Sequence, residues 1–108
     1  MRPLANDAEV EEMLDRETAV LFKHSPICGT SARARRQVER FVARNPDTPV
    51  YVLDVLEARD LSRRVAERFG IRHESPQAIV LRRGAPIWTG SHFRITARAL
   101  QREVRRPS

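Results

Sequence analysis

Three short apolar runs, separated by stretches with helical spacing, limit what this chain can fold into more than any other feature of its sequence. Residues 19–22, 50–55 and 78–81 are nearly continuous in apolar side chains, as expected of strands that are covered on both faces. Amphipathic patterns of one helix length lie between successive runs. A strand–helix–strand unit of this kind pairs its strands in parallel with a right-handed crossover. The sequence therefore predicts an α/β domain with helices on both faces of a sheet.

Caps and turn residues predict where the elements begin and end. Asn6, with Glu9 three residues later, resembles a helix start, and Gly70 is well placed to end a helix in the left-handed conformation. Arg83-Gly84 indicates a tight turn and hence an antiparallel hairpin. The expected helices cover about 7–16, 29–44 and 58–69, with a last one capped by Thr96, and the expected strands cover about 18–23, 50–55, 77–81 and 86–89. Together they predict a three-layer sandwich, thioredoxin-like in outline, with a four-stranded mixed sheet flanked by helices.

Length and composition bound the organisation and the location of the protein. At 108 residues the chain is expected to be one domain, residues 1–108, with about 105–108 as a frayed tail. Its longest apolar run has four to five residues, far too few to span a membrane, and its N-terminus lacks the apolar segment of a secretory signal. A single cysteine forms no internal disulfide. These features favour a reducing cytoplasm.

The formal net charge is +6 and is carried almost wholly by arginine. An excess of basic residues is typical of proteins that bind nucleic acid. The arginines are spread over several predicted helices, however, and few aromatic side chains lie among them to stack on bases. We therefore expect solvated helix faces, with no nucleic acid and no membrane among the partners.

The only cysteine, Cys28, falls in the turn between a predicted strand and a predicted helix. Unpaired N–H groups and the positive end of the helix dipole occur there, and both favour a thiolate. Lys23 or His24 would add to this effect if their side chains point inward. Ser31 lies one turn along the same helix face, where its hydroxyl can donate to the thiolate but cannot resolve a disulfide. The alternative is a buried, inert cysteine that fills space.

No metal site or resident cofactor is expected. The three histidines and one cysteine could in principle ligate zinc, but their spacing matches no short metal-binding motif. A single cysteine cannot build a multi-cysteine metal site within one chain.

One string of the chain is specific, residues 69–78, which read Phe-Gly-Ile-Arg-His-Glu-Ser-Pro-Gln-Ala, whereas the pair Cys28-x-x-Ser31 is weak by itself. With them stand the stretches 22–25, 53–55, 59–62, Trp88 and 91–93. Together these strings resemble the monothiol bacilliredoxins, a thioredoxin-fold family of the bacillithiol system. The resemblance runs over nearly the whole chain.

The resemblance implies a cytoplasmic thiol–disulfide oxidoreductase that removes bacillithiol from mixed disulfides of client proteins. Cys28 would be the attacking thiolate and would form a Cys28–bacillithiol intermediate, with Ser31 assisting it. Ser75–Pro76 would be a cis peptide bond facing the cysteine. Bacillithiol would be a co-substrate, with no bound cofactor, and the protein would act as a monomer or weak dimer. The residues expected to contact substrate are Lys23, His24, Gly29, Thr30, His73, Glu74, Ser75 and Pro76.

Two other functions stay open. Bacilliredoxins usually carry proline directly after the cysteine, whereas this chain reads Cys28-Gly29-Thr30-Ser31, which resembles monothiol glutaredoxins that handle iron–sulfur clusters with glutathione. The first alternative is therefore a dimer that ligates a cluster through Cys28 and a low-molecular-weight thiol. The second is a redox-inert thioredoxin-like domain that uses its arginine face for protein or RNA contacts. For His73 and Glu74, the plainer alternative is an exposed, solvated charged pair.

Overall fold

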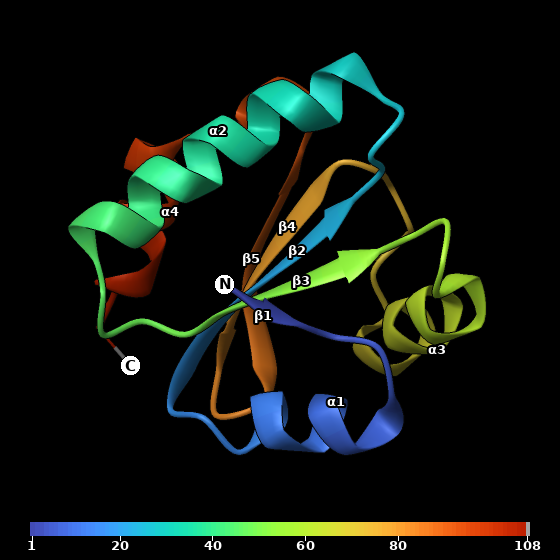
Figure 1. Ribbon diagram of the computed structural model, residues 1–108. Helices are drawn as coiled ribbons and strands as arrows, with labels where there is room; N and C mark the ends of the chain where they lie inside the picture. The colour runs from blue at the N-terminus through green and yellow to red at the C-terminus, as the bar shows by residue number, and fades with distance from the viewer. Residues whose placement is uncertain (108) are drawn as a thin grey trace.

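A computed structural model describes residues 1–107 of the chain. Over these residues the chain forms a five-stranded sheet with helices on both faces (Figure 1). In chain order the elements are β1 (Arg2–Pro3), α1 (Asp7–Leu14), β2 (Thr18–His24), α2 (Gly29–Arg44), β3 (Val50–Asp54), α3 (Arg59–Phe69), β4 (Gln77–Arg82), β5 (Ala85–Ser91), the 3-10 helix η1 (His92–Arg94) and α4 (Ala97–Val104). The predicted three-layer α/β architecture is confirmed.

The strand order across the sheet is β1-β3-β2-β4-β5. β2 runs parallel to β3, and β4 runs antiparallel to both β2 and β5. The predicted parallel unit and closing hairpin are therefore confirmed. β5 is longer than the predicted strand at 86–89, because Gly90 and Ser91 continue the ladder opposite Ala78 and Gln77.

The sequence predicted four strands, and the described part of the chain has a fifth, β1. Arg2 and Pro3 pair in parallel with Tyr51 and Val52 of β3 at the edge of the sheet. Proline is tolerated in an edge strand, although it has no N–H to donate to a ladder. A strand of two residues is too short to show alternating apolar and polar side chains, so the sequence pattern gave no sign of it.

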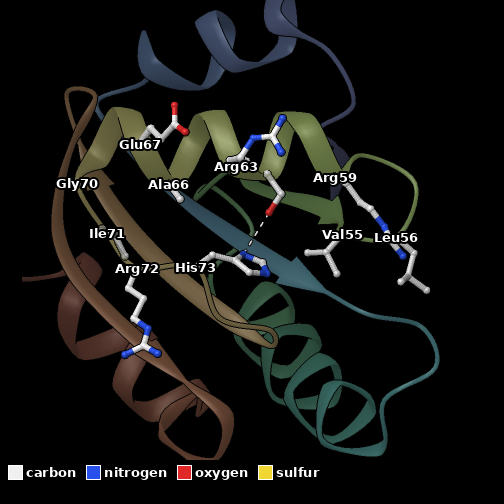
Figure 2. A pocket seen from close by; sticks show the side chains of 11 residues that line it. Val55, Leu56, Arg59, Arg63, Ala66, Glu67, Gly70, Ile71, Arg72 and His73 are labelled. Carbon is white, nitrogen blue, oxygen red and sulfur yellow. Dashed lines mark hydrogen bonds between the residues drawn. The ribbon is translucent and has the colours of Figure 1, made fainter.

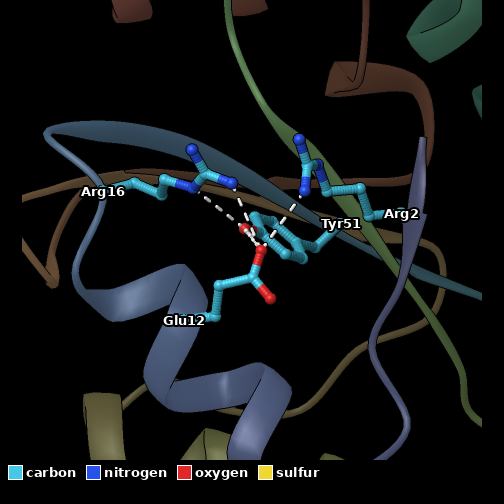
Figure 3. Close-up of polar contacts among 4 residues, drawn as sticks. All are labelled: Arg2, Glu12, Arg16 and Tyr51. Carbon is cyan, nitrogen blue, oxygen red and sulfur yellow. Dashed lines mark hydrogen bonds and ion pairs between the residues drawn. The ribbon is translucent and has the colours of Figure 1, made fainter.

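Glu12 of α1 connects β1 to β3 through a polar network (Figure 3). Its Oε1 accepts hydrogen bonds from the guanidinium groups of Arg2 at 3.3 Å and Arg16 at 3.2 Å. The Tyr51 hydroxyl donates to the same oxygen at 3.1 Å and accepts from Arg16 Nε at 3.2 Å. Because the Glu12 side chain is 48% exposed, each ion pair contributes only about 0–1 kcal/mol. The network therefore positions β1 more than it stabilises the domain.

Side chains of the central strands alternate between two cores. Leu21, Leu53 and Ile79 pack with apolar residues of α1 and α3. Val20 and Phe22 lie on the other face and pack with residues of α2 and α4. Figure 1 shows the two helix pairs on opposite sides of the sheet. Because side chains of a strand alternate, the residue after Phe22 belongs to the face that α3 covers.

Three predicted helix ends are confirmed. Asn6 Oδ1 accepts a hydrogen bond from the Glu9 N–H at 2.9 Å and caps α1. Thr96 Oγ1 accepts from the Ala99 N–H at 3.0 Å and caps α4. Gly70 ends α3 with a φ of 64°, in the left-handed region that favours glycine.

Helix α4 ends at Val104, directly before the predicted tail. Arg106 nevertheless pairs with Glu103 at 2.7 Å, and its carbonyl accepts a hydrogen bond from Arg82 at 3.0 Å. Ser108, which also belongs to the predicted tail, lies outside the described residues. None of the helices within residues 1–107 has the length and apolar character needed to cross a membrane.

Candidate functional site

Three segments of the chain meet at the carboxyl end of β2. Lys23 pairs with Leu53 of β3 on one side and with Gln77 of β4 on the other. Just beyond the strand, the Val55 N–H donates to the His24 carbonyl at 3.0 Å. The turn after β2, the turn after β3 and the segment before β4 are therefore neighbours. Open α/β sheets bind their ligands at this end of their strands.

Cys28 is the N-cap residue of α2 and is partly exposed. Its N–H donates to the Ser25 carbonyl at 3.2 Å, and its carbonyl accepts the Ala32 N–H at 3.1 Å. The sulfur itself makes no capping hydrogen bond of ordinary geometry. The backbone N–H groups of Ser31 and then Thr30 nevertheless lower the pKa of the Cys28 thiol against the opposing effect of burial, and the hydroxyls of the same two residues lower it further. The predicted strand-to-helix position is confirmed, and its surroundings favour the thiolate.

Ser31 is fully buried in the first turn of α2. Its Oγ accepts a hydrogen bond from the Ser25 N–H at 3.2 Å. Because this contact uses only an oxygen lone pair, the hydroxyl proton remains available to the Cys28 sulfur. Ser31 thus ties the turn to the helix, and its geometry is compatible with the donor role predicted for it.

Gly29 and Thr30 follow Cys28 in the first turn of α2. A Cβ at Gly29 would meet no atom within 4 Å. Proline is favoured at the first position of a helix, because the N–H that it lacks has no partner within the helix there. Nothing in the structure explains why glycine stands where the resemblance leads us to expect proline.

Lys23 is fully buried on the face of β2 that α3 covers. Its Nζ donates to the carbonyl of Ser62 and lies against Nδ1 of His73, both at 3.1 Å. The Ser62 hydroxyl is 3.3 Å from the same ring nitrogen. Since an ammonium group only donates, Nδ1 is the acceptor and the His73 ring is neutral. Two residues predicted to contact substrate, Lys23 and His73, are thus brought together.

Burial perturbs the Lys23 ammonium most. It lowers the pKa of Lys23 to about 8. Burial and the neighbouring Lys23 charge also lower the pKa of His73, while Glu74 opposes them. No carboxylate contacts the Lys23 ammonium anywhere in the part of the chain that the structure describes. Buried cations are normally paired with an anion, so the buried Lys23 ammonium without a carboxylate partner is unusual.

His24 is half-buried at the end of β2, where its ring centroid lies 5.5 Å from that of Phe22. Burial and then the positive charge of Arg35 lower the pKa of His24, while Asp54 raises it. Its Nδ1 is buried and has no hydrogen-bond partner within residues 1–107. His24 therefore ends β2 directly before the turn, and its lowered pKa favours the neutral ring.

The segment before β4 contains the cis Ser75–Pro76 peptide bond that the resemblance implied. Pro76 is buried, and its carbonyl accepts the His92 N–H at 3.1 Å. The Ser75 hydroxyl is buried without a partner among the described residues. His73 and Glu74 are both exposed, as the plainer alternative predicts, although Nδ1 of the His73 ring reaches Lys23.

Gln77 fixes the conformation of this segment through hydrogen bonds of its side chain. The sequence patterns did not predict this role. Its buried side chain donates from Nε2 to the Arg72 carbonyl at 3.0 Å and accepts the Glu74 N–H at Oε1 at 3.4 Å. The strand pattern at 77–81 gave no sign that this amide turns back toward the preceding turn. Ser62 was missed too, although it lies three residues before Val65 and so on the edge of the apolar face of α3.

A groove lies beside the Lys23 cluster, between α3 and the segments 55–56 and 70–73 (Figure 2). Ser62 and His73 line it. On the surface near the turn after β2, Ile27 is 82% exposed directly before Cys28. Within residues 1–107, no three histidine, cysteine or acidic side chains are grouped so that they could hold a metal ion.

Comparisons with known proteins agree with this geometry. The family model of the monothiol bacilliredoxin BrxC matches residues 2–100. A solved structure of a proposed oxidoreductase with a thioredoxin fold is 30% identical, with a TM-score of 0.88, and the match covers 94% of this chain and 90% of that one. Oxidised mitochondrial thioredoxin 3 from Saccharomyces cerevisiae is 16% identical, with a TM-score of 0.78 and coverage of 96% and 92%. Oxidised thioredoxin from Plasmodium falciparum is 17% identical, with a TM-score of 0.74 and coverage of 96% and 94%.

The two thioredoxins establish the fold alone, because their sequence identity is low. The predicted thioredoxin-like fold is therefore confirmed. The family model spans nearly the whole chain, and together with the 30% identical structure it supports a thiol–disulfide oxidoreductase role. This chain belongs to the monothiol bacilliredoxin family.

Proposed function

We propose that this protein removes bacillithiol from protein mixed disulfides, with Cys28 as the attacking thiolate. The observation that carries the proposal is the position of the single cysteine at the N-cap of α2, where backbone N–H groups lower the pKa of its thiol. Thiol–disulfide exchange is fastest when the pKa of the attacking thiol lies near ambient pH. Membership in the bacilliredoxin family supports bacillithiol as the low-molecular-weight thiol.

The first step exchanges one disulfide for another. The Cys28 thiolate attacks the bacillithiol sulfur of a client–S–S–bacillithiol disulfide, a new Cys28–S–S–bacillithiol bond forms, and the old S–S bond breaks. The client leaves as a thiolate and takes a proton from solvent. No net oxidation occurs, because the disulfide moves from the client to the enzyme.

The second step regenerates the enzyme. The chain has one cysteine, so a second thiol must come from outside. A bacillithiol thiolate attacks the bacillithiol sulfur of the mixed disulfide, bacillithiol disulfide forms, and Cys28 leaves as a thiolate. A separate reductase that supplies two electrons would serve the same end.

The residues around the sulfur assist both steps by stabilising the same charge. Backbone N–H groups at the start of α2 and the Ser31 hydroxyl favour the Cys28 thiolate. This charge is present before the first attack and returns when Cys28 departs in the second step. A thiol with a lower pKa is also the better leaving group.

The proposed reaction is tested by the release of a client thiol. A client protein with bacillithiol on its one cysteine is mixed with the wild type, with Cys28→Ser or with Ser31→Ala, in the presence of free bacillithiol. We expect fast release with the wild type, the buffer rate with Cys28→Ser, and an intermediate rate with Ser31→Ala. A wild-type rate equal to that of Cys28→Ser would contradict the proposal. Brown colour and visible absorbance after anaerobic purification would favour the iron–sulfur alternative instead.

A further inference from the structure

The groove beside α3 has the size of a small-molecule site. Its volume is about 720 Å³, within the range of about 300–1,000 Å³ that is typical of ligand pockets. Val55, Ala66 and Ile71 contribute apolar surface to it. Such a lining suits a molecule with a carbon framework better than a bare inorganic ion.

Arginine residues lie at both ends of the groove: Arg59 and Arg72 are exposed at opposite ends, and Arg72 is directed away from α3 in Figure 2. Arg59 and Arg63 extend from α3, and Arg72 extends from the segment after it (Figure 2). Arg63 is paired with Asp60 at 2.8 Å. Arg59 and Arg72 have no side-chain partner within residues 1–107. One carboxylate, Glu67, also lines the groove, so cations outnumber anions there.

A buried cation adds to this imbalance. The Lys23 ammonium is fully buried, and both of its contacts, Ser62 and His73, are residues that line the groove. No carboxylate neutralises it among the described residues. An anion in the groove would offset part of the cost of burying this charge. Two independent features, the free arginines and the unpaired lysine, therefore point to an anionic ligand.

The groove lies at the same edge of the sheet as the proposed exchange site. Its wall residue Val55 donates its N–H to the carbonyl of His24, the last residue of β2, which leads into the turn that carries Cys28. His73 lies three residues before Pro76. The groove is thus lined by the turn after β3 and by the segment before β4, and both are neighbours of the turn after β2 that carries Cys28.

We propose that this groove binds the carboxylate-bearing part of the low-molecular-weight thiol, with Arg59 and Arg72 as its carboxylate contacts. The inference rests on the proposed function and names where its co-substrate is held. Bacillithiol has the required chemistry, because its malyl group carries two carboxylates at the end remote from its thiol. A planar guanidinium can bind each carboxylate through two parallel hydrogen bonds.

The test uses S-methyl-bacillithiol, which keeps the carboxylates but has no free thiol and cannot exchange. Its affinity is measured by calorimetry for the wild type and for the double variant Arg59→Gln/Arg72→Gln. The matched control is Arg36→Gln/Arg40→Gln, which removes the same charge from exposed positions of α2. We expect the groove variant to bind roughly tenfold or more weakly, the scale for losing hydrogen bonds between charged groups. The control should bind as the wild type does.

Three results would overturn the groove assignment. They are equal weakening in both double variants, no wild-type binding at millimolar analogue, and amide shifts in NMR confined to residues 24–31. Removal of bacillithiol from a client is measured separately on the wild type. Analogue binding in the groove without such removal would refute the proposed function and leave the groove assignment standing. A fourth result, removal at equal efficiency by the wild type and the groove variant, would refute the groove assignment and leave the proposed function standing.

Discussion

Nζ of Lys23 lies 3.1 Å from Nδ1 of His73, although the two residues are 50 positions apart in the chain. The contact joins the end of β2 to the segment before β4, and it joins a cation to a neutral acceptor. A buried charge without an opposite charge destabilises a fold. Strongly perturbed ionisable groups of this kind are concentrated at functional sites. Lys23 borders both the turn after β2, which carries Cys28, and the arginine-lined groove.

Lys23→Met should remove a pH dependence of stability. The pKa of Lys23 is lowered from 10.5 to about 8 in the folded protein, so between these values the unfolded chain binds more protons than the folded one. The free energy of unfolding of the wild type should therefore rise with pH across this window, by up to about 3 kcal/mol. Below about pH 8 both the folded and the unfolded chain bind this proton, so the free energy of unfolding should level off at its lower value. Methionine fills a similar volume without charge, and urea denaturation at several pH values should show no such rise in the variant. If the free energy of unfolding depended on pH in the same way in the wild type and in Lys23→Met, the lowered pKa of Lys23 would be contradicted.

Ser31→Ala should raise the pKa of the Cys28 thiol, because it removes a hydroxyl donor that favours the thiolate. Alkylation by iodoacetamide, followed against pH, should shift to higher pH. At neutral pH the reaction should slow by roughly threefold to tenfold, the scale of one lost hydrogen bond. Thr30→Val is the matched control and should shift the profile less, since the Thr30 hydroxyl has the smaller effect on the sulfur. An unchanged profile for Ser31→Ala would refute this role.

The main architecture and the position of Cys28 could be predicted from the sequence, because both depend on local signals. The apolar runs of β2, β3 and β4 and the cap at Asn6 can be read without knowing the tertiary structure. Strand β1 could not be predicted, since its two residues are placed by pairing with β3.

Within the site, too, features set by local sequence could be predicted, and features set by contacts between distant segments could not. The turn position of Cys28 follows from one strand end and one helix start. The side-chain direction of Lys23 depends on which face of β2 is covered by α3, and its contact with Ser62 crosses 39 positions of the chain. The arginine-lined groove likewise forms only when the end of α3 and the segment after it are packed together.

Replacing Gly29 by alanine should stabilise the protein by about 0.4–1 kcal/mol, because the unfolded chain loses freedom and the folded chain has room for a Cβ. Gly29→Pro should act in the same direction at this first helical position. Gly70→Ala is the opposite case, since its φ of 64° disfavours a side chain, and it should destabilise by about 1 kcal/mol. Urea denaturation measures all three variants. Destabilisation by Gly29→Ala would show that glycine is required there for a structural reason.

Gln77→Met should loosen the segment before β4. The substitution leaves the Arg72 carbonyl and the Glu74 N–H without their side-chain partner, at a cost of about 1–3 kcal/mol in the free energy of unfolding. Amide exchange at Glu74 should become faster. Thr89→Val removes only the long 3.5 Å contact to the same side chain, so it should change both quantities much less. Equal effects of the two substitutions would mean that Gln77 does not brace this segment.

The intact mass of the enzyme during turnover tests the exchange mechanism most directly. The wild type is mixed with a bacillithiolated client, the reaction is quenched with acid under non-reducing conditions, and both proteins are weighed. The mechanism predicts a wild-type species heavier by one bacillithiol, with the addition on the peptide that contains Cys28, and no such species for Cys28→Ser. A wild type that stays unmodified while Cys28 is reduced and accessible to alkylation would contradict it.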